Sequence, residues 1–183
     1  MLEDDFSLSL QNKAIGLLAF HTGLRSCDIA ALTFDQIDWE NDFRIVQQKI
    51  GMPLIMPLRA IVGNVIFDYI TKERPKSPEN TVFLTIHAPY RRLHTSNLHA
   101  ICVIIMKKTG IRNHPQDVKG FHLFLHHLAT SLLEKGVEHP VISCTLGHQS
   151  PQSLNTYLQS DFIHLKECAL SIDCFPVKEE VFL

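Results

Sequence analysis

The chain has 183 residues, of which 45 % are hydrophobic and 20 % charged, and its formal net charge is −2 at pH 7. This balance suits one soluble globular domain, and no apolar run reaches the roughly 18 residues of a membrane span. The first residues, MLEDD, are acidic where a secretory signal would be basic, so we expect a cytoplasmic protein. The near-neutral charge argues against a general nucleic-acid binder, although the clusters YRR and MKK leave room for a basic face.

The first half of the chain predicts two helices, a β-hairpin and a third helix. Apolar residues at helical spacing give a first helix over 9–22 that stops at Gly23. The segment SCDIAALTFDQID, residues 26–38, is expected to form a second short helix capped by its first serine. The segments FRIVQQKI and MPLIMPL are typical of two strands joined through Gly51. An amphipathic helix over 58–74 then ends before a proline.

The second half predicts further helices, with loops at 77–95 and 113–120. The first of these loops surrounds one short extended piece. We therefore expect a mainly α-helical fold with one small antiparallel β-sheet, of the α+β class. The helices expected in this half cover residues 96–110, 121–133, 137–148, 150–159 and 161–171.

Five cysteines are scattered along the chain, mostly in apolar helical settings. Their odd number favours reduced, buried thiols over a disulfide framework, and no CxxC pair suggests zinc.

Three histidines crowd the segment FHLFLHHLATSLL, residues 121–133. His122 and His126 are four apart and share a helix face, whereas His127 points elsewhere. Zinc proteases with this spacing carry a glutamate directly after the first histidine, but here Leu123 follows. His148 could supply a third metal ligand, yet no carboxylate stands at a matching spacing, so a zinc site is disfavoured. For any one of these histidines alone, an inert hydrogen-bonded core residue would be the default.

Three blocks change that reading because they occur together and in order: TGLRSCDIAAL (22–32), HLFLHHLATSLLEKGV (122–137) and LGHQSPQSLNTY (146–157). Together they resemble the catalytic domain of the tyrosine recombinases, or phage-type integrases, over about residues 8–170. The family has a Thr-Gly-Leu-Arg turn, then His-x-x-Arg-His, then Leu-Gly-His with a tyrosine nine residues further on. The spacing from His148 to Tyr157 matches that pattern.

The resemblance implies a phosphoryl-transfer site that needs no metal or other cofactor. Tyr157 would attack the scissile phosphate and form a 3′-phosphotyrosyl link. Arg25, with His122 or His148, would hold the phosphate. Lys49, on the predicted hairpin, would protonate the departing 5′ oxygen.

Three further positions follow from the same alignment. His126 would assist phosphate binding or proton transfer, and His127 lies outside the motif, on the surface or in packing. Asp28 would orient a catalytic group, or it is simply a carboxylate favoured at a helix start. We expect Arg25 and the other site residues, position 125 included, to converge on one concave face.

Leu125 departs from the family pattern. Alignment on Ala129 and Thr130 places the family's second arginine at position 125, and no arginine lies between Arg112 and the end of the chain. Losing one charge-assisted clamp in such a site typically costs about 3 kcal/mol. Either an engineered or acquired substitution sits in an otherwise intact site, or the chain is a naturally silent DNA-binding or assembly module.

The expected organisation is a catalytic domain over residues 1–172 and a C-terminal tail over 173–183, without the N-terminal DNA-clamp domain of related integrases. The implied partners are double-stranded DNA and further protomers of the same recombinase, with no membrane. The tail either packs on its own domain or docks on a neighbouring protomer. A prokaryotic, phage or mobile-element context fits this interpretation.

Overall fold

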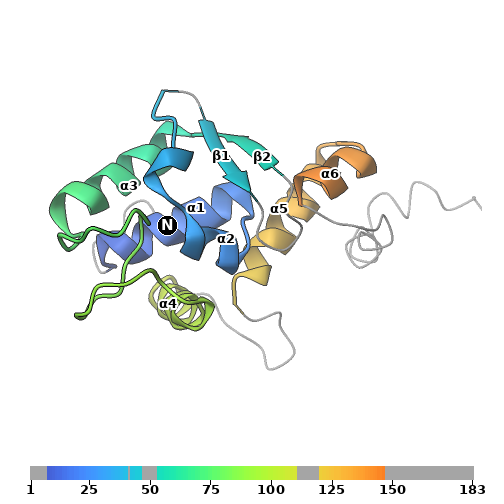
Figure 1. Cartoon of the computed structure of the whole chain (residues 1–183). Coiled ribbons are helices and arrows are strands. Elements are labelled where there is room, and N and C mark those ends of the chain that lie inside the picture. The colour runs from blue at the N-terminus through green and yellow to red at the C-terminus, as the bar shows by residue number, and fades with distance from the viewer. Residues whose placement is uncertain (1–7, 41, 47–52, 111–119, 147–183) are drawn as a thin grey trace, which may run out of the picture.

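The computed structural model describes residues 8–40, 42–46, 53–110 and 120–146 of the chain. Helices predominate in these described residues (Figure 1). Several predicted features lie outside them, namely Lys49, Gly51, His148, Tyr157, the helices expected over 150–159 and 161–171, and the tail.

Helix α1 (Leu10–Thr22) runs through the centre of the molecule, and both of its ends are fixed by specific groups (Figure 1). The Ser9 hydroxyl accepts a hydrogen bond from the Asn12 backbone N–H at 3.2 Å. The Glu73 carboxylate accepts from the first two backbone N–H groups of the helix, at 2.7 and 3.2 Å. These groups have no partner inside a helix, so both contacts stabilise its start. Gly23, in the left-handed region with φ 61°, ends the helix as predicted.

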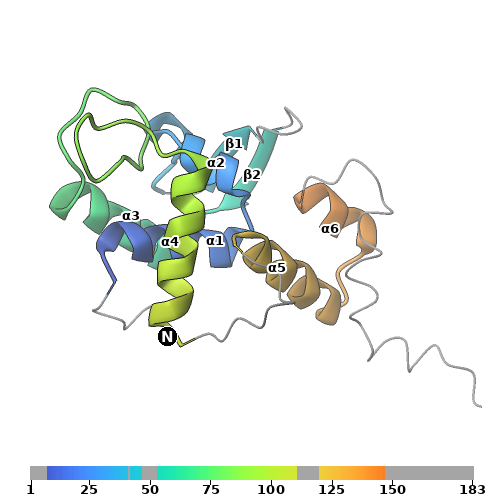
Figure 2. The same ribbon diagram turned by 90° about the horizontal axis from the view of Figure 1, so that it is seen from below.

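Three helices pack around α1: α3 (Ala60–Lys72), α4 (Thr95–Lys108) and α5 (His122–Glu134) (Figures 1 and 2). Two shorter helices pack on these, α2 (Ser26–Ala31) on α4 and α6 (His139–Thr145) on α5. The sequence predicted these helices, with ends that differ by a few residues except for the second. That helix was expected over 26–38 but ends at Ala31.

The turn at Gly23 brings the start of α2 close to α5. A Cβ atom at Gly23 would lie only 2.7 Å from Cδ2 of Leu128 on α5. The positive φ and the lack of space both require glycine here. The close approach of the α1–α2 turn to α5 is what positions the site described below.

Buried apolar side chains form two clusters. The larger joins α1, α3, α4 and the start of α5, and Ile15, Leu18, Ile66 and Leu98 are fully buried in it. The smaller cluster lies between α5 and α6, and we call it the α5–α6 cluster. Its buried members are Leu125, Ala129, Leu133, Ile142 and Leu146.

Strands β1 (Asp42–Val46) and β2 (Pro53–Pro57) form an antiparallel hairpin, with Asp42 opposite Pro57 and Val46 opposite Pro53. The helices and this hairpin confirm the predicted mainly α-helical fold with one small antiparallel sheet.

The start of α2 differs from the prediction. Ser26 is the first residue of the helix rather than its cap, and Arg25 holds the N-cap position with extended backbone (φ −69°, ψ 153°). The helix has only six residues, because a second capping signal follows. The Gln36 side chain accepts from the Thr33 backbone N–H at 3.0 Å and starts a 3₁₀ helix, η1 (Phe34–Gln36).

The cysteines only partly follow the prediction of buried thiols. Cys102 is buried, and burial raises its pKa to about 11. Cys27 is half-buried and Cys144 is exposed, so the prediction is wrong for Cys144, which lies on the short outer helix α6. Among the described residues, no helix has both the length and the apolar character needed to cross a membrane.

Candidate active site

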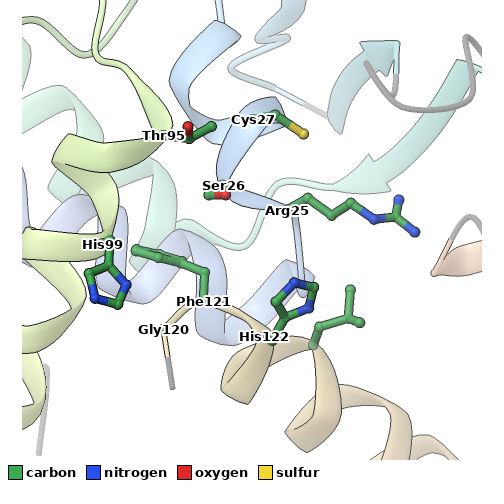
Figure 3. A pocket seen from close by; sticks show the side chains of 9 residues that line it. Arg25, Ser26, Cys27, Thr95, His99, Gly120, Phe121 and His122 are labelled. Atoms are coloured by element: carbon green, nitrogen blue, oxygen red, sulfur yellow. The ribbon is translucent and has the colours of Figure 1, made fainter. Parts of the chain in front are cut away.

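A cavity of about 420 Å³ opens where the first turns of α2, α4 and α5 meet (Figure 3). Its lining combines one guanidinium, two imidazoles and two hydroxyls with apolar groups. The lining residues are Arg25, Ser26, Cys27, Thr95, His99, Gly120, Phe121, His122 and Leu125. The guanidinium of Arg25 gives this lining a cation of the kind that binds phosphate and carboxylate groups.

Arg25 links this cavity to α6. In Figure 3 its side chain extends away from the start of α2, on the side of the cavity where His122 lies and opposite His99. Its Nη2 donates a hydrogen bond to the backbone carbonyl of Leu146 at 2.8 Å. Leu146 is the C-cap residue of α6 and begins the sequence block LGH. The structure therefore brings the first and third sequence blocks together at Arg25.

His122 and His126 occupy successive turns of α5, as predicted, but their surroundings differ. His122, the first residue of the helix, is exposed and lines the cavity. His126 is half-buried and is not among the lining residues. Burial lowers the pKa of His126, and repulsion from the neighbouring imidazole of His122 lowers it further. The neutral form of His126 is therefore favoured near neutral pH, and a neutral imidazole is able to accept a proton.

Leu125 lines the same cavity as Arg25 and His122. Its side chain is only 5 % exposed and belongs to the α5–α6 cluster. Position 125 thus faces the site and at the same time packs against the neighbouring helix. An arginine at this position would keep its methylene groups in the cluster and carry its guanidinium into the cavity.

Two other residues singled out from the sequence have clear environments. Asp28 is buried, with 2 % exposure, in the first turn of α2. His127 is exposed and stacks on the ring of Phe20 with centroids 4.8 Å apart, which confirms the prediction that it lies on the surface or in packing.

Thr95 and His99 were not predicted as site residues. They are four apart on α4, so they share one helix face, and this spacing was the only sequence signal available. Within the described part of the chain, no group of three His, Cys, Asp or Glu side chains could hold a metal ion. Lys49, His148 and Tyr157 lie outside the described residues, so their sites stay predictions.

Solved structures share this fold. A crystal structure of the XerA recombinase matches with a TM-score of 0.74 at 21 % identity, over 97 % of this chain and 62 % of that one. The XerH site-specific recombinase bound to palindromic difH substrate, a post-cleavage complex, matches with a TM-score of 0.73 at 21 % identity, over 94 % of this chain and 50 % of that one. The fold is that of a tyrosine recombinase catalytic domain.

The sequence gives the particular family. The model of the phage integrase family matches residues 1–164, and the chain belongs to this family. The integrase/recombinase homologue y4rA of Sinorhizobium fredii (strain NBRC 101917 / NGR234) is 34 % identical over 92 % of this chain, which spans 41 % of y4rA. The homologue y4gC of the same organism is 31 % identical over 92 % of this chain, which spans 86 % of y4gC.

Proposed function

We propose that this chain is the catalytic domain of a DNA recombinase that cuts and rejoins strands through Tyr157, and that Leu125 lowers its activity. One observation carries the proposal. Arg25, His122 and position 125 line one cavity, and Arg25 also holds the carbonyl of Leu146. Residues from all three sequence blocks thus meet at one place.

The reaction is a transfer of one phosphoryl group without net loss of bond energy. The phenolic oxygen of Tyr157 forms a bond to phosphorus, and the bond from phosphorus to the 5′ oxygen breaks. Lys49 gives a proton to that oxygen, which leaves as a hydroxyl. A tyrosine hydroxyl, with a pKa of about 10, gives up its proton readily enough to serve as the nucleophile. Attack by the 5′-hydroxyl of another strand reverses these steps and rejoins the DNA.

The charge on the phosphate must be neutralised during this transfer. The planar fork of Arg25 donates parallel hydrogen bonds to two phosphate oxygens. His122 or His148 donates to the same group. His126, one turn from His122 on α5, assists phosphate binding or the transfer of the tyrosine proton; its lowered pKa favours the neutral imidazole that the second role needs. Asp28 lies in the first turn of α2, three residues after Arg25. Its role in this proposal is to orient a catalytic group.

The proposed substrate is duplex DNA, bound by several protomers of the same protein. Exposed basic side chains lie next to both ends of α4, with Arg91 and Arg92 before it and Lys107 and Lys108 in its last turn. They are exposed cations available for contacts with phosphate groups. The similar XerH structure is one of a recombinase bound to its difH substrate, which supports DNA as the partner. We propose that residues 1–172 form the catalytic domain and that the tail, 173–183, packs on this domain or docks on a neighbouring protomer.

A second candidate is a silent DNA-binding or assembly module of the same family. Leu125 favours this candidate, because a nearly fully buried leucine replaces the cation that would share the phosphate with Arg25. The two candidates differ in one chemical product, since only the enzyme forms a covalent protein–DNA adduct.

The test uses a set of overlapping duplexes that cover the DNA on either side of the gene for this protein. Each duplex carries a nick, so that the short strand released by cleavage diffuses away and the covalent adduct accumulates. Adducts are counted on denaturing gels. The native chain should form few adducts, and Leu125→Arg should raise their rate about a hundredfold or more, the usual effect of one such clamp. Leu125→Met, which keeps the volume without the charge, is the matched control and should not change the rate.

Adding Tyr157→Phe to Leu125→Arg should abolish the adduct, because the phenolic oxygen is removed. An adduct that survives this change would place the nucleophile elsewhere. If Leu125→Arg and the native chain both form no adduct on any duplex while binding DNA, the silent module is the better description.

A further inference from the structure

Leu125 and Leu146 belong to the same packed group of side chains. Both are nearly fully buried in the α5–α6 cluster, with exposures of 5 % and 2 %. Helix α6 has only seven residues, too few to be stable alone, so its position depends on this cluster. Leu125 forms the part of the cluster that also faces the cavity.

The backbone of Leu146 is coupled to the cavity by a different contact. The last carbonyl groups of a helix lack partners within the helix. The carbonyl of Leu146, at the C-cap of α6, accepts a hydrogen bond from Nη2 of Arg25 at 2.8 Å. Any displacement of α6 at this end therefore also displaces the acceptor that orients the guanidinium.

We infer that Leu125 is a positioning residue for Arg25. Its side chain fixes the C-terminal end of α6, and the Leu146 carbonyl in turn fixes the guanidinium at the cavity. The bond uses one hydrogen of Nη2 in a planar fork of five N–H donors, so it sets the plane in which the guanidinium meets an anion. A side chain that is already held in place loses less conformational freedom when it binds.

The inference rests on the proposed function, in that the anion held by Arg25 is a DNA phosphate. It adds a second consequence of the leucine. The chain lacks a cation at position 125, but leucine at this position holds the guanidinium of Arg25 more firmly than a shorter or polar side chain would. A merely degenerate position would tolerate alanine without any effect on Arg25.

The test measures the reactivity of Arg25 itself in the full-length protein. Phenylglyoxal modifies arginines, and peptide mass spectrometry gives the rate at Arg25. Inorganic phosphate is added as the competing anion, and the concentration that halves the rate reports its affinity. Leu125→Ala should react about fivefold faster and need about fivefold more phosphate, which is the effect of losing one ordinary hydrogen bond.

Two controls separate positioning from general loss of stability. Leu125→Met conserves the side-chain volume, so the reaction rate at Arg25 and the phosphate concentration that halves it should both stay at their native values. Leu133→Ala removes the same atoms from the α5–α6 cluster two turns further along α5, where the side chain does not line the cavity. It should lower the urea midpoint as Leu125→Ala does, but leave the reactivity and phosphate protection of Arg25 unchanged. If Leu125→Ala does not fold, Leu125→Val should show the same direction with a smaller change.

Equal effects of Leu125→Ala and Leu133→Ala on Arg25 would overturn the inference, as would native behaviour of a folded Leu125→Ala. If phosphate protects Arg25 in no variant but the order of reactivities holds, the positioning role stands and the phosphate site of the proposed function is wrong.

Discussion

Gly23→Ala should destabilise the protein through two separate effects. A non-glycine residue in the left-handed region costs about 1–2 kcal/mol. Gly23 has φ +61°, and its added Cβ would lie 2.7 Å from Leu128 Cδ2. Overpacking of this kind typically adds about 1–3 kcal/mol, because α5 must shift away from the α1–α2 turn. The expected loss in the free energy of unfolding is therefore about 2–5 kcal/mol.

Gly136→Ala is the matched control. Gly136 has nearly the same φ, +71°, but nothing lies within 4 Å of an added Cβ. Urea unfolding followed by circular dichroism measures both variants, with the slope m checked for two-state behaviour. The difference between them isolates the contact with Leu128 and should be about 1–3 kcal/mol. Equal losses for the two variants would refute the argument that α5 and the α1–α2 turn are in close contact.

Three further outcomes are expected. Burial lowers the pKa of His126 in the folded protein, so the stability that its neutral form contributes is present above the unfolded pKa of about 6.5. That stability is lost as the pH falls through the lower folded pKa. His126→Gln should therefore flatten the fall in urea midpoint between pH 7.5 and 5. Arg74→Lys should cost about 1–3 kcal/mol, since the guanidinium donates to the carbonyls of Pro75, Glu79, Thr81 and Val82, whereas Arg91→Lys on the exposed surface should cost almost nothing in the same assay. Binding to duplex DNA, measured by fluorescence anisotropy, should weaken steeply with salt; a Kd that does not change between low and physiological salt would contradict phosphate contacts as its source.

Local signals in the sequence were enough to predict most of the elements and the family, although the helix expected over 26–38 stops at Ala31. Gly23 marks the end of α1 because only glycine takes a positive φ without strain, and that property belongs to the residue itself. The hairpin and the helices follow from the spacing of apolar residues, since side-chain period depends on backbone geometry alone. Leu125 could also be recognised as unusual from the sequence, because the alignment of the block 122–137 determines which residue stands at the second arginine position.

Only the tertiary structure decided how these residues are held. The guanidinium of Arg25 bonds to a backbone carbonyl 121 residues further along the chain, and every residue has such a carbonyl, so no pattern could predict that partner. Thr95 and His99 line the cavity only because α4 packs on α2. Leu125 is both buried and cavity-facing because α6 covers one side of it, and the position of a seven-residue helix is determined by packing rather than by its own propensity.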